Sequence, residues 1–376
     1  MEWVLLLLGA VLGVTVDKAY DWGRRRGDVR RLAKHYRSIN EKHIQIQSLS
    51  PALQLVQGGW DSSGFFSPGS IVLRVHGPYR GPRQISELLE RHAEQWLSSG
   101  ASNLPQIGIS SFRVDRISDD PTEERQGTAH RLLLQGHTYS YFEFLASHRL
   151  LLDGAEDERA MLAALDITAN LDAPAPSLPT PISIGLTVIA EEGAFLILSR
   201  RATTASHAGT WAGGCVFNAV GEGAAPRDLA SAGYGADTMS PEVTAARGLF
   251  EEIGMRAHDM VRTQVRIHSF VFDATLLDYK FFGVAETSLS ANQVESRWRE
   301  AQDRSEASDL ISVSIKTKLE CLALVEKLVA EEDEWSPEAI FCTIRTLLCL
   351  GQIRPEDVIS AASRRSPGAR QFKKTI

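Results

Sequence analysis

The segment 247–255, with the sequence RGLFEEIGM, constrains this chain more than any other stretch. Apolar residues recur at helical spacing through it and through the residues before it: Val243, Ala246, Leu249, Phe250 and Ile253. This pattern predicts an amphipathic helix over 241–254 whose apolar stripe packs on a sheet. Ser240 fits the N-cap and Pro241 the first turn, and Gly254 fits the end of the helix.

The same segment places two adjacent carboxylates, Glu251 and Glu252, on the last turn of the predicted helix. Arg247 lies four residues before Glu251, so the two side chains can form an ion pair. Two carboxylates of this kind suit a hard cation, because Mg²⁺ is bound by one or two carboxylates together with phosphates and waters. A solvated helix face also carries such pairs, so the flanking sequence has to decide between the two interpretations.

The residues upstream of the helix follow a recognisable order. A strand-like segment ends in arginine, a tryptophan and a Gly-Gly pair follow, and a Gly-Glu pair comes next: Arg200 or Arg201, Trp211, Gly213-Gly214 and Gly221-Glu222. Together with Arg247, Glu251, Glu252 and Gly254, this order resembles the Nudix hydrolases over 182–315. The resemblance covers a little over a third of the chain.

The resemblance implies roles for individual positions. Glu251 and Glu252 are expected to be catalytic and to bind Mg²⁺ or Mn²⁺, and Glu222 is a further expected metal ligand. Arg247 is expected to orient these carboxylates. Substrate-binding roles fall on the residues at Arg200, Arg201, Gly213 and Gly214, with the Gly213 carbonyl as an additional ligand. The implied reaction is attack of water on a phosphorus of a nucleoside diphosphate linked to another group.

Three features depart from the family pattern. Gly248 stands where the family has a glutamate, and Glu222 and Arg247 are 25 positions apart instead of eight. A register that keeps the family spacing would use Gly233 and place Met239 at the glutamate position; Glu222 is preferred because its Gly-Glu and Gly-Gly neighbours survive. An additional acid in a later loop is also expected, and three residues qualify: Glu286, Asp303 and Glu306.

The chain is predicted to be an α/β (α+β) protein. Alternating β-branched segments at 182–190, 194–199, 265–274 and 277–284 predict a mixed sheet between helices, as in a Nudix α/β/α sandwich. Four prolines within 172–181 mark a linker. The predicted organisation is a transmembrane anchor at 1–26, an α+β module at 27–171, the linker at 172–181, the Nudix domain at 182–315 and C-terminal helices at 316–376.

The aromatic residues of the N-terminal module allow two interpretations. The segment 130–152 is rich in aromatic and apolar side chains, including Tyr139, Tyr141, Phe142 and Phe144. These residues form either a binding face or part of a core, and burial in a core is the commoner arrangement for such side chains.

The N-terminus predicts a membrane anchor. Residues 3–16 form an uncharged apolar run, and extension to Trp22 reaches the length of a span. Arg24, Arg25 and Arg26 follow directly, which places the soluble parts in the cytoplasm. A signal peptide fits less well, because its first residues would be basic; a buried core helix is the other alternative.

Composition narrows the function classes. The net charge is −7, so nothing indicates a nucleic-acid partner, and the four cysteines lack the spacing of a zinc or redox site. The expected partner is a nucleotide-derived small molecule, and the chain is compatible with an oligomer. Two functions fit: a Mg²⁺-dependent diphosphohydrolase, or a catalytically weak nucleotide-binding sensor, which Gly248 and the lengthened motif favour.

Overall fold

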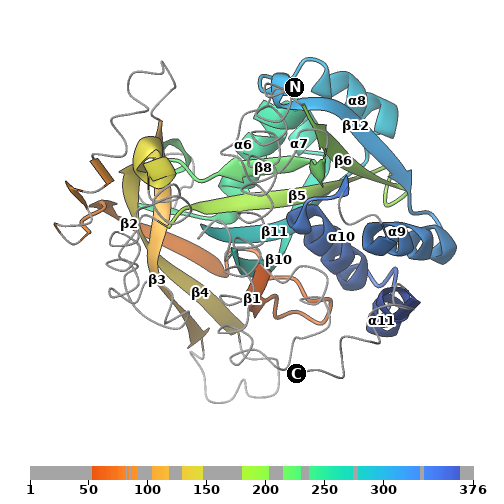
Figure 1. Ribbon diagram of the computed structural model, residues 1–376, viewed down its shortest axis with the longest axis horizontal. Coiled ribbons are helices and arrows are strands. Elements are labelled where there is room, and N and C mark those ends of the chain that lie inside the picture. The colour runs from red at the N-terminus through yellow and green to blue at the C-terminus, as the bar shows by residue number, and fades with distance from the viewer. Residues whose placement is uncertain are drawn as a thin grey trace, which may run out of the picture. The chain divides into compact units, whose positions relative to one another are not determined.

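The computed structural model describes residues 53–81, 83, 86–87, 89–90, 104–117, 129–146, 180–202, 215–229, 237–273, 278–330 and 334–364 (Figure 1). The chain forms two compact units, 1–44 and 45–376, and every described residue belongs to the second unit. The predicted anchor at 1–26 lies outside the described residues, as do 172–179 of the predicted linker. Within the described ranges, no helix combines the length and the apolar character needed to cross a membrane.

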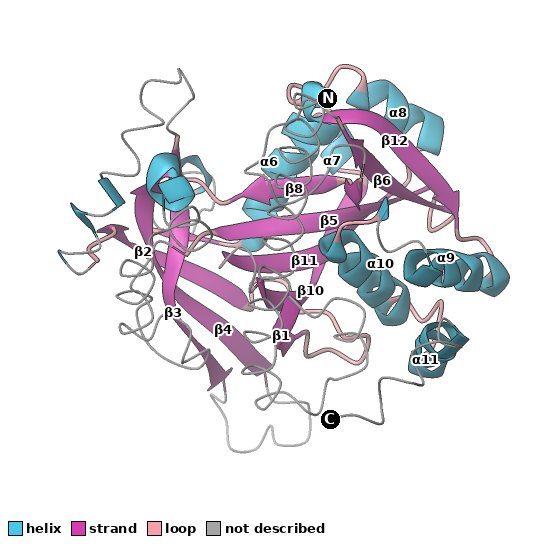
Figure 2. Ribbon diagram, viewed as in Figure 1, coloured by secondary structure: helices cyan, strands magenta, loops and turns pink. Residues whose placement is uncertain are grey.

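The larger sheet carries the candidate site. Its strands run in the order β1 (Leu53–Gly58), β10 (Thr263–Asp273), β11 (Asp278–Thr287), β5 (Ile182–Ala190), β6 (Phe195–Arg201) and β12 (Ala307–Ser314). Two short strands extend it, β7 (Val216–Asn218) on β6 and β8 (Val220–Gly223) on β5. Strands β11 and β5 are parallel and the other pairs antiparallel, so the predicted mixed sheet is confirmed (Figure 2).

The turn between β5 and β6 explains why these two segments form a hairpin. Glu191, Glu192 and Gly193 have φ values of 54°, 51° and 99°, which reverse the chain within a few residues. Glycine adopts this left-handed region without strain, whereas the two glutamates bear a steric cost there. The reversal places β6 directly antiparallel to β5, with Val188 opposite Ile197.

Six helices of the described chain follow or flank the sheet. They are α6 (Pro241–Ile253), α7 (Ala257–Met260), α8 (Ala291–Trp298), α9 (Lys318–Ala330), α10 (Pro337–Cys349) and α11 (Pro355–Arg364). Helix α6 contacts β5, β8 and β10, and α10 contacts β1, β5, β7, β10 and β11. Buried side chains of α9 and α10, among them Leu324, Leu328 and Ile344, form one core with Leu196 and Leu198 of β6.

A second, four-stranded sheet joins the two halves of the chain. Its order is β3 (Pro105–Ile117), β4 (Ala129–Ser140), β2 (Ile71–Pro78) and β9 (Thr238–Met239). Strand β9 comes from the segment inserted between Glu222 and Arg247, yet it pairs with β2. Strand β1 pairs in turn with β10 of the larger sheet. Strands from both sides of 172–181 therefore share both sheets, and the predicted boundary falls inside the unit 45–376.

Candidate functional site

Residue 248 determines how closely helix α6 approaches strand β8. A Cβ atom at Gly248 would lie 2.5 Å from Val220 Cγ1 and 3.0 Å from Glu222 Cβ. Real Cβ atoms do not come within 2.5 Å of another carbon, so only glycine fits this contact as it stands. A side chain at this position would need space that β8 occupies, and the close contact brings Glu222 next to the helix.

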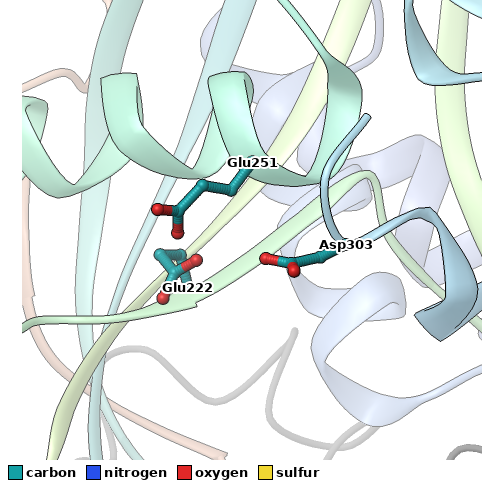
Figure 3. Close-up of side chains that lie close together, drawn as sticks. All are labelled: Glu222, Glu251 and Asp303. Atoms are coloured by element: carbon teal, nitrogen blue, oxygen red, sulfur yellow. The ribbon is translucent and has the colours of Figure 1, made fainter. Parts of the chain in front are cut away.

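Three carboxylates from separate elements converge beside this contact (Figure 3). Glu222 comes from β8, Glu251 from the last turn of α6 and Asp303 from the residue before the 3-10 turn Arg304–Glu306. One oxygen from each lies within 4.8 Å of the other two. The Asp303 N–H donates to the Glu251 carbonyl oxygen at 2.9 Å, which fixes the later loop against α6. An all-oxygen set of this size suits a hard divalent cation.

Asp303 is therefore the later acid that lies with the other carboxylates. Glu286, another of the three candidates, forms an ion pair with Arg266 on the neighbouring strand. Glu306 lines the adjacent cavity without belonging to the cluster. Sequence spacing could not distinguish the three residues, because the loop that carries Asp303 is positioned by the fold.

Arg247 lies at the centre of the acidic side chains. Its guanidinium contacts Glu222 Oε1 at 2.8 Å and Glu251 Oε2 at 3.0 Å. It also donates to Asp228 Oδ1 at 2.7 Å and to the Gly223 carbonyl oxygen at 2.5 Å. Burial alone would lower the pKa of Arg247, but its hydrogen bonds and ion pairs with Asp228 and Glu222 outweigh it and raise the pKa. Arg247 therefore stays charged and holds the carboxylates in place.

Asp228 is a functional residue that the sequence did not indicate. It ends the 3-10 turn Pro226–Asp228 within the inserted segment and is 2% exposed. Besides Arg247, its carboxylate accepts hydrogen bonds from Thr244 Oγ1 and the Ala225 N–H. Asp228 lies in an inserted segment that has no fixed spacing to Arg247, so the sequence could not indicate that the two residues pair. The insertion thus supplies the main anchor of Arg247.

Glu252 occupies a different position from Glu251. Its carboxylate accepts a hydrogen bond from the Gly221 N–H, at 2.9 Å to Oε1 and 3.2 Å to Oε2. It lines the cavity but is not one of the three residues within 4.8 Å. Burial raises the pKa of Glu252 well above its usual value, and the negative charge of Glu222 adds to the effect.

Two arginines, Arg227 and Arg247, contact the cluster of three carboxylates, so the negative charge of the cluster is only partly balanced. Burial raises the pKa of Glu222 to about 7, although Arg247 counteracts the shift. Burial also raises the pKa of Asp303, and the charges of Glu306 and Glu251 reinforce it. Arg227 contacts Glu251 at 3.1 Å from the solvent side. Crowded carboxylates with raised pKa values are stabilised in their charged form by a cation placed among them.

A cavity of about 600 Å³ opens beside the carboxylates, which is within the range of small-molecule sites. Its lining includes Glu222, Glu251, Glu252 and Asp303 at one end. The N-terminal module contributes Tyr139, Tyr141 and Phe144 to the same lining, while Phe142 is buried at 2% exposure. The aromatic segment is therefore divided between a cavity wall and the core.

The expected substrate-binding residues have different positions. Arg201 lines the cavity, and its guanidinium lies 5.1 Å from the centre of the Phe217 ring. Burial lowers the pKa of Arg201, while the charges of Glu306 and Glu338 oppose this shift. Arg200 is adjacent on β6 but is not part of the cavity lining. Gly213 and Gly214, with Trp211, lie outside the described residues.

Comparison with known proteins finds similarity among solved structures. No protein-family model matches the chain, and no curated protein matches it. A solved structure of a Nudix hydrolase from M. smegmatis, RenU, is similar to 44% of this chain and 81% of that chain. The sequence identity is 19% and the TM-score 0.25.

Proposed function

We propose that the chain is a metal-dependent hydrolase that cleaves the diphosphate of a nucleotide derivative. The observation that carries the proposal is the convergence of Glu222, Glu251 and Asp303 beside a cavity of about 600 Å³. Residues far apart in sequence are brought together around Arg247, and oxygen ligands of this kind fit Mg²⁺ or Mn²⁺. The nucleotide part of the proposal rests on the Nudix resemblance of the sequence.

The roles of the residues follow from their positions. Glu222, Glu251 and Asp303 would hold the cation, which when bound stabilises negative charge on phosphate oxygens. Arg247 keeps Glu222 and Glu251 in place. We assign Glu252 as the base that accepts a proton from the attacking water at a carboxylate oxygen. Burial raises the pKa of Glu252, which makes its carboxylate a stronger base than an exposed glutamate.

The hydrolase proposal is tested by turnover. Full-length protein is incubated with Mg²⁺ or Mn²⁺ and a panel of nucleotide sugars, dinucleotides and nucleoside triphosphates, and release of phosphate or nucleoside monophosphate is measured. Glu252→Gln is expected to lower kcat by about 10²–10⁴-fold, as for loss of a general base. Glu356→Gln, on the exposed first turn of α11, serves as the matched control and should leave the rate unchanged. Metal-independent turnover, or turnover that Glu252→Gln leaves intact, would sink the proposal.

A binding module is the second candidate. It is favoured by the arginines that already contact the cluster, since Arg227 and Arg247 both contact Glu251. Gly248 supports it as well, because the family's glutamate cannot fit there without movement of β8. Calorimetry with the same nucleotide panel distinguishes the two functions: a sensor binds a nucleotide without turnover, and a chain that binds none is not a sensor.

We also propose that residues 1–26 anchor the protein in a membrane and leave the remainder in the cytoplasm. The support is the apolar run at 3–16 followed by Arg24, Arg25 and Arg26. Deletion of 1–26 should move the protein from the membrane fraction to the soluble fraction. Full-length protein that is already soluble without detergent would contradict the anchor.

A further inference from the structure

The two arginines that contact the clustered carboxylates differ in how firmly they are held. The Arg247 side chain is 11% exposed and forms ion pairs with three carboxylates: Glu222, Asp228 and Glu251. The Arg227 side chain is 54% exposed, and among the residues that the structure describes only Glu251 forms an ion pair or hydrogen bond with it. Arg247 is therefore fixed by several partners, whereas Arg227 is free to move once a single contact breaks.

That single contact occupies the whole Glu251 carboxylate. Arg227 Nη1 lies 3.1 Å from Glu251 Oε1, and Arg227 Nη2 donates to Glu251 Oε2 at 3.2 Å. Two parallel N–H groups on two oxygens are the strongest geometry that an arginine forms with a carboxylate. Glu251 is also one of the three clustered residues. Whichever of its oxygens a cation takes, Arg227 contacts that oxygen too.

A bound cation and the Arg227 guanidinium would lie close together. A divalent cation such as Mg²⁺ lies about 2.1 Å from a carboxylate oxygen, so Arg227 Nη1 would be within about 5 Å of a cation on Glu251 Oε1. The Arg227 charge also reaches the other two carboxylates. Burial raises the pKa of Glu222 and that of Asp303, and Arg227 is among the charges that oppose each rise. Positive charges at this separation repel each other, so the cation and Arg227 compete for Glu251.

The backbone under Arg227 is held firmly while its side chain is not. Arg227 is the middle residue of the 3-10 turn Pro226–Asp228. Asp228, 2% exposed, fixes this turn by accepting hydrogen bonds from Arg247 and Thr244. An ion pair with a half-exposed arginine contributes little to stability, so the side chain can leave Glu251 without loss of the turn. Arg227 also lines the cavity, which gives the displaced guanidinium room.

We infer that Arg227 is a displaceable counter-ion that competes with the divalent cation for Glu251 and lowers the affinity of the site for metal. The inserted segment, from which Arg227 comes, thereby sets the cation concentration at which the site fills. This inference rests on the proposed function only in taking Glu222, Glu251 and Asp303 as the metal site. It concerns the regulation of that site by a residue that is not a metal ligand.

The test measures Mn²⁺ affinity by electron paramagnetic resonance with full-length protein and no substrate. Arg227→Gln, which removes the charge, should bind Mn²⁺ about fivefold or more tightly than the wild-type protein. Arg227→Lys, which keeps the charge without the two parallel donors, should fall between the two. The matched control is Arg113→Gln on β3, because Arg113 is 67% exposed and pairs with Asp115 at 3.0 Å; it should leave the affinity unchanged. Equal or weaker binding in Arg227→Gln overturns the inference.

A double-mutant cycle shows whether Arg227 acts through Glu251. In a Glu251→Gln background there is no charged carboxylate for Arg227 to hold, so most of the gain from Arg227→Gln should disappear. A gain of the same size in both backgrounds would overturn the competition for Glu251. Absence of Mn²⁺ binding from both the wild-type protein and Arg227→Gln would remove the proposed metal site together with this inference. Equal, saturable binding by both proteins would remove only the inference and leave the metal site standing.

Discussion

At the scale of single residues, Gly248 allows helix α6 and strand β8 to come into close contact. Any larger residue would have a Cβ that lies 2.5 Å from Val220 Cγ1, so only glycine fits this position without movement of β8. Glu222 approaches α6 through the gap that the glycine leaves, and Asp303 lies with it and Glu251. The glycine at 248 and the three clustered carboxylates are therefore parts of one local arrangement.

Gly248→Ala tests this packing. Replacement of glycine by alanine inside a helix ordinarily adds about 1 kcal/mol of stability, but overpacking of a core costs about 1–3 kcal/mol. We expect the variant to lower the free energy of unfolding in urea by about 1–2 kcal/mol. In a Val220→Ala background, which removes the clashing methyl group, the same change should be neutral or stabilising. An equal effect of Gly248→Ala in both backgrounds would contradict the close contact.

His268 makes stability depend on pH. It is fully buried, and its ring nitrogens lie 3.1 Å from Thr346 Oγ1 and 3.0 Å from Ser269 Oγ. Burial lowers the pKa of His268 well below 6.5, and the nearby Arg345 and Arg266 add to the effect. At acidic pH, His268 therefore binds a proton in the unfolded chain but stays neutral in the folded chain. Stability supplied by the neutral ring is present above about pH 6.5 and is lost as the pH falls below it.

Below about pH 6.5, the free energy of unfolding is expected to fall by at most about 1.4 kcal/mol per pH unit because of His268. Urea unfolding of the wild-type protein and His268→Asn at about pH 7.5 and 5.5 measures it. The stability difference between the two proteins should shrink at the lower pH. A difference that is independent of pH would show that His268 is protonated in the folded protein.

At the scale of elements, the inserted segment is an integral part of the site. The turn Pro226–Asp228 supplies the buried carboxylate that holds Arg247, and β9 pairs with β2. Asp228→Ala would leave Arg247 without its main partner, and removal of one member of a buried ion pair costs about 3–5 kcal/mol. We expect such a loss in urea unfolding, whereas Asp309→Ala on the exposed strand β12 should change stability by less than about 0.5 kcal/mol. A small effect of Asp228→Ala would show that Glu222 and Glu251 alone hold Arg247.

Strand β5 and helix α6, in the second half of the chain, were predicted from the pattern of apolar and capping residues in the sequence. The expected strand at 182–190 coincides with β5, and the helix predicted over 241–254 is α6, which ends at Gly254 with φ 76°. Period-2 alternation, a capping glycine and an amphipathic stripe are local signals. The position of Asp303 and the role of Asp228 depend on contacts between distant segments, so their sequence neighbours carried no signal for them.

At the scale of the whole molecule, residues 53–146 and 180–364 share two sheets. The proline-rich composition of 172–181 indicated a boundary there, but composition cannot show which strands pair across it. Strand β1 pairs with β10, and β9 pairs with β2, so each half supplies a strand to a sheet of the other. Such pairings between distant segments leave no periodic trace in either strand.

A fragment that begins at residue 180 should therefore not fold stably by itself. It would expose the β10 edge that β1 covers, and it would lose Leu53 and Phe65, which are 0% and 1% exposed. An unprotected strand edge with lost core packing favours aggregation. We expect no cooperative thermal transition for the fragment, in contrast to a chain that begins at residue 45. A soluble fragment with a cooperative transition would show that the second half folds independently.

The central claim is that Glu222, Glu251 and Asp303 form one metal site. Titration of full-length protein with Mn²⁺, followed by electron paramagnetic resonance, tests it without reference to any substrate. The account predicts saturable binding that weakens about tenfold or more in Glu222→Gln, Glu251→Gln and Asp303→Asn, and that Glu356→Gln leaves unchanged. Mn²⁺ binding that is absent from the wild-type protein, or that Asp303→Asn and Glu222→Gln both leave unaltered, would contradict it.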